Sequence, residues 1–131
     1  MGGRVVAVLD TSVLLFWAMD RRRLTQAATR EISQADHIII SSMSMWEIGV
    51  KVGKGKLYIP QPIREFAERI RRVDRVEIAP VDLDIWLKNI ELDWEHRAPA
   101  DRTIVATAEL YDCPLVTSDA TIREYYDKSV W

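Results

Sequence analysis

The feature that most constrains the fold is a repeated pairing of a short apolar run with the polar side chains that follow it. The run from Val5 to Leu9 is rich in valine and ends at Asp10, and Ile38-Ile39-Ile40 ends in serine hydroxyls. Continuous apolar runs of this length are typical of strands buried on both faces of a parallel sheet. Hydroxyl side chains after such runs are suited to capping helices, Thr11 and Ser12 after the first run among them. An alternation of strands and helices is therefore predicted.

The rest of the chain continues this alternation. Further strands are predicted at Val76 to Ala79, at Leu115-Val116-Thr117 and at Val130-Trp131. Apolar side chains at helical spacing predict helices over residues 13–17, 24–34, 45–52, 62–72, 81–90, 101–111 and 118–126. Strands alternating with helices favour an α/β fold. We expect a three-layer sandwich in which a short, mostly parallel central sheet of four to five strands has helices on both faces.

Length and composition indicate one ordinary globular domain over residues 1–131. The chain is 48% hydrophobic and 29% charged, which excludes wholesale disorder and fibrous architectures. The single cysteine, Cys113, cannot pair within the chain and is expected to be a buried apolar side chain. The longest apolar run, Val13 to Met19, is far shorter than a membrane helix. We expect a cytoplasmic protein with no membrane partner, and the net charge of -2 argues against a general nucleic-acid coat.

Four acidic residues are predicted to meet at one edge of the sheet. Asp10 ends the first strand, and Asp119 follows the fourth. Glu47 lies in the first turns of the helix after the second strand, and Asp101 begins the helix that leads into the fourth. Parallel strands have their carboxyl ends at a common edge, and crossover helices start there. All four side chains are therefore expected at the same rim.

Each acid also has a structural explanation of its own. Glu47 could close a capping box, Asp101 could complement a helix dipole, and Asp119 could cap the last helix. Gathered in one rim, however, the carboxylates would repel one another, and a divalent cation would relieve that repulsion. Mg²⁺ and Mn²⁺ prefer hard oxygen ligands of this kind, whereas neither His37 nor His96 has a partner at zinc-ligand spacing. The pattern favours a Mg²⁺ or Mn²⁺ site.

The motifs around these acids resemble those of PIN-domain ribonucleases. Leu-Asp-Thr-Ser at Asp10, Ser-Met-Trp-Glu-Ile at Glu47, Pro-Ala-Asp-Arg-Thr-Ile-Val-Ala-Thr-Ala at Asp101 and Val-Thr-Ser-Asp at Asp119 occur in that family's order and spacing. The resemblance spans essentially the whole chain and is greatest to the VapC-type toxins of toxin-antitoxin pairs. It implies a metal-dependent endoribonuclease, a cognate antitoxin that inhibits it, and a homodimer. Many relatives carry a further acid where this chain has Ala98.

Specific roles follow from this hypothesis. The residues expected to bind the ion, directly or through water, are Asp10, Asp101 and Asp119. Glu47 is expected to bind a second ion or to orient the attacking water. Ser12 and Thr117 are hydroxyls that could hydrogen-bond the carboxylates or the phosphate, with helix or strand-end capping as the alternative.

Other interpretations stay open. The chain could be a PIN-like interaction module without nuclease activity, or another Mg²⁺-dependent phosphoester hydrolase. A haloacid-dehalogenase-type phosphatase is disfavoured because it needs a second aspartate where Ser12 stands, and residues 49–56 lack the pattern of a phosphate-binding loop. Basic residues at 21–23 and at 51, 54 and 56 either hold RNA phosphates or are ordinary solvated helix ends. Trp17 and Trp46 are predicted to pack mainly in the core, with a partner groove as the alternative.

Overall fold

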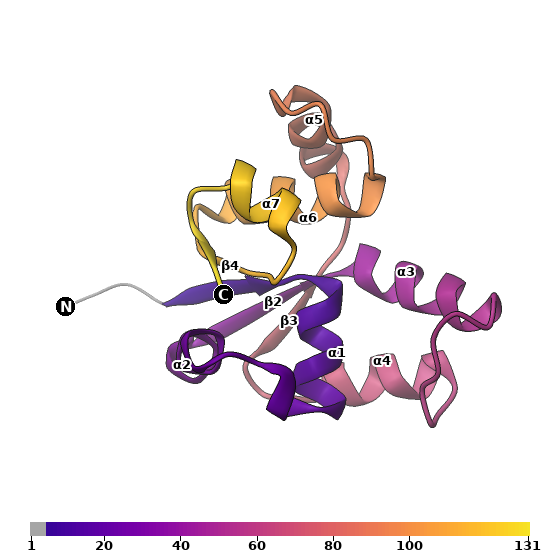
Figure 1. The fold of residues 1–131 in the computed structure, drawn as a ribbon. Helices are drawn as coiled ribbons and strands as arrows, with labels where there is room; N and C mark the ends of the chain where they lie inside the picture. Colours follow the sequence, from indigo (N-terminus) through magenta and orange to yellow (C-terminus); the bar gives the residue numbers. More distant parts are fainter. Residues whose placement is uncertain (1–4) are drawn as a thin grey trace.

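The computed structural model describes residues 5–131, and its central feature is a parallel sheet (Figure 1). The strands are β1 (Val6–Leu9), β2 (His37–Ser41), β3 (Val76–Ala79), β4 (Leu115–Val116) and β5 (Ser129–Val130). Within the described residues they form one sheet in the order β3-β2-β1-β4-β5, and every neighbouring pair is parallel. The predicted parallel sheet is therefore confirmed at the upper end of its expected size.

Helices cover both faces of this sheet. Their bounds are α1 (Thr11–Met19), α2 (Gln26–Gln34), α3 (Ser42–Gly53), α4 (Ile63–Arg71), α5 (Leu83–Glu91), α6 (Pro99–Tyr111) and α7 (Ala120–Tyr125), with a 3-10 turn at Arg21–Arg23. Figure 1 shows α1 to α4 on one side of the sheet and α5 to α7 on the other. None of the helices between residues 5 and 131 is long and apolar enough to cross a membrane.

The two helical layers pack on alternate side chains of the same strands. In β1, Ala7 and Leu9 belong to the core under α1 to α4, whereas Val8 belongs to the core under α5 to α7. In β2, Ile38 belongs to the core under α1 to α4, and Ile39 belongs to the core under α5 to α7. These five side chains are no more than 1% exposed. Because successive residues of a strand point to opposite faces and both faces are covered, the strands are continuous apolar runs.

Polar groups at the carboxyl ends of the strands begin the helices that follow. The cap of α1 is Asp10, whose Oδ1 accepts a hydrogen bond from the backbone N–H of Val13 at 2.8 Å. The prediction that Thr11 or Ser12 provides this cap is wrong, because the helix begins at Thr11, two residues before its predicted start at residue 13. Ser41 caps α3 through its hydroxyl, as the run of serines predicted. A cap of this kind stabilises a helix by about 1 kcal/mol.

The order of the strands reverses between β1 and β4. Successive strands β2 and β3 add to one side of β1, whereas β4 and β5 lie on the other. In open α/β sheets, ligands bind at such a reversal, outside the carboxyl ends of the strands. Leu9 is in register with Val116, so the next residues, Asp10 and Thr117, face each other across the reversal. The topology thus marks the position of a candidate site.

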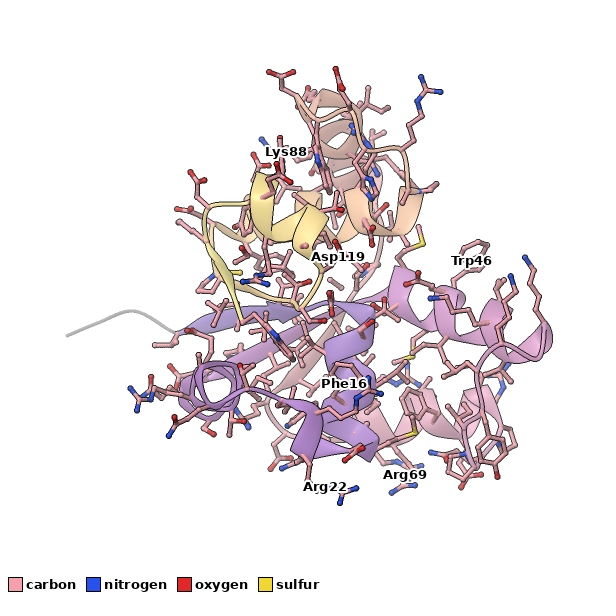
Figure 2. All side chains as sticks on the ribbon, in the orientation of Figure 1. Phe16, Arg22, Trp46, Arg69, Lys88 and Asp119 are labelled. Carbon is pink, nitrogen blue, oxygen red and sulfur yellow. The ribbon has the colours of Figure 1, made fainter. Side chains whose placement is uncertain are left out.

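Predictions for individual side chains of the core had different outcomes. Cys113 is 4% exposed and packs in the core under α5 to α7, as expected of a small apolar side chain. Trp17 is 7% exposed and packs in the other core, which confirms its prediction. Trp46 is 64% exposed, so the prediction that it packs in the core is wrong. Its helix turns this side chain away from the sheet, and Figure 2 shows it projecting from α3.

Candidate functional site

Asp10 lies at the reversal of strand order and is almost entirely buried, with 5% of its surface exposed. Its Oδ1 accepts the hydrogen bond from Val13, and its Oδ2 accepts one from the hydroxyl of Thr117. The backbone N–H of Asp10 donates to the carbonyl of Val116 at 3.1 Å. Both carboxylate oxygens are therefore held in fixed directions between the ends of β1 and β4.

The burial of Asp10 makes its negative charge costly. Burial raises the pKa of this carboxyl from 3.8 to about 6. The hydrogen bonds from Thr117 and Val13 lower the pKa, whereas the negative charges of Asp101 and Asp119 raise it further. A carboxyl whose pKa is shifted by burial and by like charges is a candidate functional group. The ionised form of Asp10 is thus unfavourable in its buried position, and a nearby cation would stabilise it.

Asp101 lies in the first turn of α6, which starts at the carboxyl edge of the sheet. Burial raises the pKa of this carboxyl, and a hydrogen bond with His96 opposes the rise. The negative charges of Asp119 and Glu47 raise the pKa further. The structure therefore brings the predicted acids close enough for their charges to interact, although they come from separate segments of the chain.

Asp119 connects to Asp10 through a shared hydroxyl. The backbone N–H of Asp119 donates to Oγ1 of Thr117 at 3.0 Å, and the same hydroxyl donates to Asp10. Asp119 also caps α7, because its Oδ1 accepts from the backbone N–H of Ile122 at 3.1 Å. In Figure 2 its side chain lies beneath α7, between the two helical layers. The capping explanation for Asp119 is confirmed, and its second oxygen makes no hydrogen bond to any part of residues 5–131.

Glu47 stands at the rim of the site, on α3. Its Oε2 lies 3.5 Å from Nζ of Lys51, one helical turn further on. Glu47 and Asp101 both line a surface hollow of about 590 Å³. The capping-box explanation for Glu47 does not hold, because Ser41 caps the helix. Glu47 is thus free of a capping role and borders the same space as Asp101.

The two hydroxyls predicted to support the carboxylates behave differently. Thr117 is fully buried and bonds directly to Asp10. Ser12 is exposed, and no hydrogen bond joins its hydroxyl to the described part of the chain. Its neighbour Thr11 instead forms a buried hydrogen bond with Ser44 at 2.9 Å, which ties α1 to α3. Thr117 is thus a hydroxyl that the sequence indicated near the carboxylates and that does bond one, whereas no sequence pattern indicated the bond between Thr11 and Ser44.

His96 is a residue of the site whose position the sequence did not predict. Its Nε2 lies 2.8 Å from Oδ2 of Asp101. Neither His37 nor His96 has a partner at zinc-ligand spacing, and a contact between a histidine and a carboxylate made from an irregular segment follows no spacing pattern. The only signal was the place of His96 five residues before Asp101, ahead of a helix start.

The donor set suits a hard divalent cation without forming a closed cage. Within residues 5–131, no three side chains of His, Cys, Asp or Glu converge into a ready metal-binding group. Mg²⁺, however, usually keeps several waters and is held by one or two carboxylates together with phosphate oxygens. Asp10 and Asp101, whose pKa values are raised by burial and by the charges of neighbouring acids, offer such oxygens here. The oxygens present are therefore of the chemical kind that a hydrated divalent ion binds.

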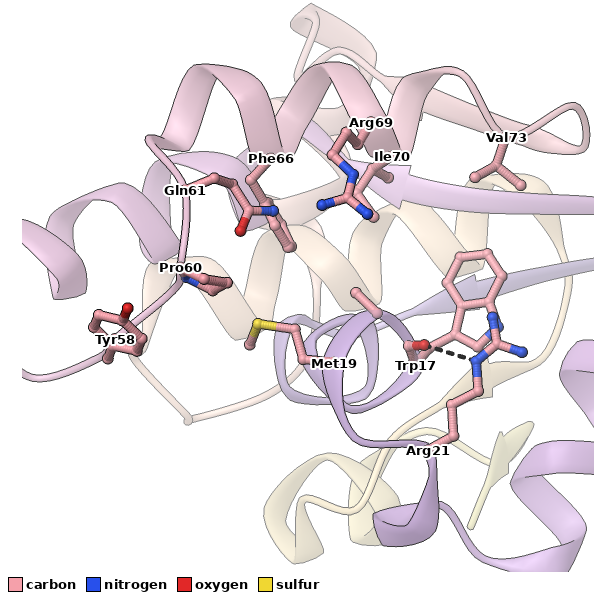
Figure 3. Close-up of a pocket in the computed structure, with 11 residues that line it drawn as sticks. Trp17, Met19, Arg21, Tyr58, Pro60, Gln61, Phe66, Arg69, Ile70 and Val73 are labelled. Carbon is pink, nitrogen blue, oxygen red and sulfur yellow. Dashed lines mark hydrogen bonds between the residues drawn. The ribbon is translucent and has the colours of Figure 1, made fainter.

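The basic triplet lies away from this site. Arg21 to Arg23 follow the carboxyl end of α1, whereas Asp10 begins that helix. Nε of Arg21 donates to the carbonyl of Trp17 at 2.9 Å, and the guanidinium of Arg23 lies 4.4 Å from the centre of the Phe16 ring. A hollow of about 570 Å³ opens between this end of α1 and α4 (Figure 3). Contact of the triplet with substrate phosphates near the acids stays a prediction that the geometry does not favour.

Comparison with known proteins decides the family. The family model described as PIN domain matches residues 7–128, which is most of the chain. The chain belongs to the PIN-domain family. This PIN domain is 26% identical over 122 residues to "Ribonuclease VapC22" of Mycobacterium tuberculosis, with 90% of each chain covered. The predicted resemblance to VapC-type proteins is therefore confirmed.

Solved structures share the fold of this PIN domain. A toxin-antitoxin complex from Klebsiella pneumoniae matches with a TM-score of 0.67 and 18% identity, over 95% of this chain and 96% of the other. VapC20 of Mycobacterium tuberculosis, described as a sarcin-ricin loop cleaving toxin, matches with a TM-score of 0.61 and 19% identity, over 90% and 93%. At these identities the likeness establishes the fold, and the predicted PIN-like sandwich is confirmed.

The raised pKa of Asp10 predicts a pH-dependent stability. The folded-state pKa of about 6 lies above the usual 3.8, so the native state holds the proton more tightly than the unfolded chain. Without divalent cations, the free energy of unfolding should fall by about 3 kcal/mol from this group as the pH rises between these two values. Asp10→Asn, which has no charge to bury, should then be more stable than the wild type at about pH 7.5, and the difference should shrink toward about pH 4.

This prediction is measured by urea unfolding of both proteins in EDTA at the two pH values. Glu65→Gln is the control, because Glu65 is exposed on α4 and far along the chain from the site. Equal stability of Asp10→Asn and wild type at the higher pH would contradict the account of a costly buried charge.

Proposed function

We propose that this PIN domain is an endoribonuclease that hydrolyses RNA phosphodiester bonds with Mg²⁺ or Mn²⁺, and that it acts as the toxin of a toxin-antitoxin pair. The observation that carries the proposal is the position of buried Asp10 near Asp101 and Asp119, whose negative charges both raise the pKa of Asp10. The similarity to Ribonuclease VapC22 supports RNA as the substrate class. The description of VapC20 as a cleaving toxin supports the biological role.

The proposed roles follow from the contacts of each acid. Asp10, Asp101 and Asp119 would hold the ion, directly or through water, and Glu47 at the rim would hold a second ion or orient the attacking water. A bound divalent ion supplies neutralisation of the phosphate, an activated water and stabilisation of the leaving oxygen. Thr117 fixes the direction of Oδ2 of Asp10 and lowers the pKa of that carboxyl, which favours the ionised form needed for binding.

An interaction module without chemistry is the alternative from another functional class. Asp10 caps α1, but an asparagine would cap that helix equally well without a charge that is costly to bury, so such a module does not need the carboxylate. Retention of that charge beside two further acids therefore favours a catalytic site. A different Mg²⁺-dependent phosphoester hydrolase would share the site, and it is separated by comparing RNA with small phosphoesters as substrates.

Replacing Asp119 by asparagine tests the catalytic role with little effect on the fold. The amide oxygen of asparagine caps a helix as well as a carboxylate does, so α7 should keep its start. Loss of the charge should lower RNA cleavage in Mg²⁺ or Mn²⁺ by on the order of 100-fold, because the cation that would neutralise the phosphate would be held more weakly. Cleavage is measured on a folded sample confirmed by circular dichroism, with Glu65→Gln as the matched loss of an exposed carboxylate. Undiminished cleavage by Asp119→Asn would remove this residue from the mechanism.

A second copy of the chain is proposed to cover an apolar surface on α3 and α5. The exposed side chains of this surface are Trp46 (64%), Leu83 (69%), Trp86 (42%), Leu87 (45%) and Ile90 (73%). Trp46 and Trp86 border one hollow, and Trp86 and Ile90 border the next, so the surface is continuous. Soluble monomers rarely leave a continuous apolar surface of large side chains open to water. The resemblance to VapC-type proteins supports the same homodimer.

The homodimer is tested by placing a charge in this surface. Trp46→Glu should shift the protein from dimer to monomer in sedimentation velocity, because the carboxylate would be buried without a partner. Tyr58→Glu is the control, since Tyr58 is 80% exposed and lies outside the surface. A wild type that sediments as a monomer, or a Trp46→Glu variant that stays dimeric, would contradict the proposal.

A cognate antitoxin is proposed to occupy the hollow between α1 and α4. Figure 3 shows Met19, Tyr58 and Phe66 around this hollow, with the guanidinium groups of Arg21 and Arg69 beside them. Apolar walls with two cationic groups fit a peptide segment that carries both apolar side chains and carboxylates. The fold likeness to a toxin-antitoxin complex supports a partner of this kind.

Reversing one charge of the hollow tests this partner. Arg69→Glu should weaken binding of the cognate antitoxin by roughly tenfold or more, because a carboxylate of the partner would meet a like charge. RNA cleavage by the isolated protein should be unchanged. Binding is measured by titration calorimetry, with Arg64→Glu, exposed on the same helix, as the control. Equal affinities of wild type and Arg69→Glu would place the antitoxin elsewhere.

A further inference from the structure

The segment between α5 and α6, residues 92–98, has no regular structure but is held by one side chain. Arg102 of α6 donates through Nη1 to the carbonyls of Trp94 at 2.5 Å and His96 at 3.0 Å. Its Nη2 donates to the carbonyls of Asn89 at 2.5 Å and Leu92 at 3.4 Å, and its Nε donates to Oδ1 of Asn89 at 3.2 Å. The planar guanidinium thus fixes the path of the backbone across the whole segment.

Aromatic rings hold the same segment from the other side. The ring of Trp94 stacks on that of Tyr125 in α7, with centroids 4.6 Å apart and planes at 12°. The ring of His96 packs against Trp94, with centroids 4.8 Å apart and planes at 39°. Offset aromatic contacts of this kind restrict the orientation of both rings. The imidazole of His96 is therefore held in place by its backbone and by its neighbour.

This fixed imidazole meets the carboxylate of Asp101. Nε2 of His96 lies 2.8 Å from Oδ2 of Asp101. An ionised carboxylate only accepts hydrogen bonds, so Nε2 carries the hydrogen and donates it. The other oxygen, Oδ1, makes no hydrogen bond within residues 5–131. The bond therefore fixes the rotation of the carboxylate through one oxygen and leaves the other for a ligand.

We propose that His96 is a positioning residue for Asp101. Its Nε2–H holds Oδ2 of Asp101 and thereby sets the direction of Oδ1 for the divalent ion. Arg102 holds the backbone of the segment that carries His96. The proposal rests on the proposed function, because it assumes that Asp101 binds the ion. Hydrogen-bonded partners of metal-binding carboxylates commonly change metal affinity by about 10- to 100-fold when they are removed.

A purely structural tie between the segment and α6 is the competing explanation, and it makes a different prediction. Loss of such a tie would lower stability and leave ion affinity unchanged. Because Arg102 alone makes hydrogen bonds to four residues of the region, loss of the single bond from His96 should leave the segment in place. Ion affinity is therefore the measurement that separates the two explanations.

The experiment measures binding of Mn²⁺ alone, by titration calorimetry and without RNA. His96→Leu removes the donor, and His96→Asn keeps an amide that is too short to reach Oδ2. His96→Gln places an amide N–H where Nε2 stands. Arg97→Ala is the control, because Arg97 is the exposed next residue in the same segment. Thermal melts in EDTA show whether each variant is folded. If His96→Leu is unfolded, the proposal is tested by comparing the Mn²⁺ affinity of His96→Asn with that of His96→Gln.

The Leu and Asn variants should bind Mn²⁺ roughly tenfold or more weakly than the wild type, whereas Gln should restore the affinity to within about threefold. The Arg97→Ala variant should bind as the wild type does. Equal affinity of the wild type and the Leu and Asn variants would overturn the positioning role and leave the proposed function standing. Equal losses in the Asn and Gln variants would also overturn it, because the donor would not matter. A wild type that binds no Mn²⁺ would overturn the proposed function and this inference with it.

Discussion

The structure depends on the burial of an aspartate at the carboxyl end of the central strand, β1, where its negative charge is unfavourable. Asp10 is 5% exposed, and burial with the nearby charges of Asp101 and Asp119 raises its pKa to about 6. Its neighbours limit that cost, because the start of α1 and the hydroxyl of Thr117 each donate to one of its oxygens. These donors do not remove the repulsion among the acids. A divalent ion would, and the function that we propose follows from that need.

The sequence was sufficient to predict the fold because the sheet is covered on both faces. Strands such as β1 and β2 then have no polar alternation, and their valine and isoleucine runs are easy to distinguish from the amphipathic helices. The same reasoning placed Asp10 and Asp119 at one edge, since parallel strands end together. The structure adds that the strand order reverses between β1 and β4, which sets these two strand ends side by side. Topology, more than any single motif, therefore predicted which acids would meet.

The rest of the site depends on contacts that have no periodic pattern. His96 reaches Asp101 from an irregular segment whose path is set by the hydrogen bonds of Arg102, and no spacing rule describes such a path. Trp46 was predicted to be buried because large aromatic side chains usually are, but its place on α3 turns it away from both cores. Sequence patterns indicate which residues share a face, whereas they do not indicate which faces stay uncovered.

The most direct test of the central claim is the position of a bound ion. Crystals grown or soaked in Mn²⁺ would give an anomalous difference peak that identifies the metal without reference to activity. The account predicts a peak at the carboxyl edge between β1 and β4, bound to Asp10 and to Asp101 or Asp119 directly or through one water. A peak at another place, or none at a concentration that supports RNA cleavage, would contradict it.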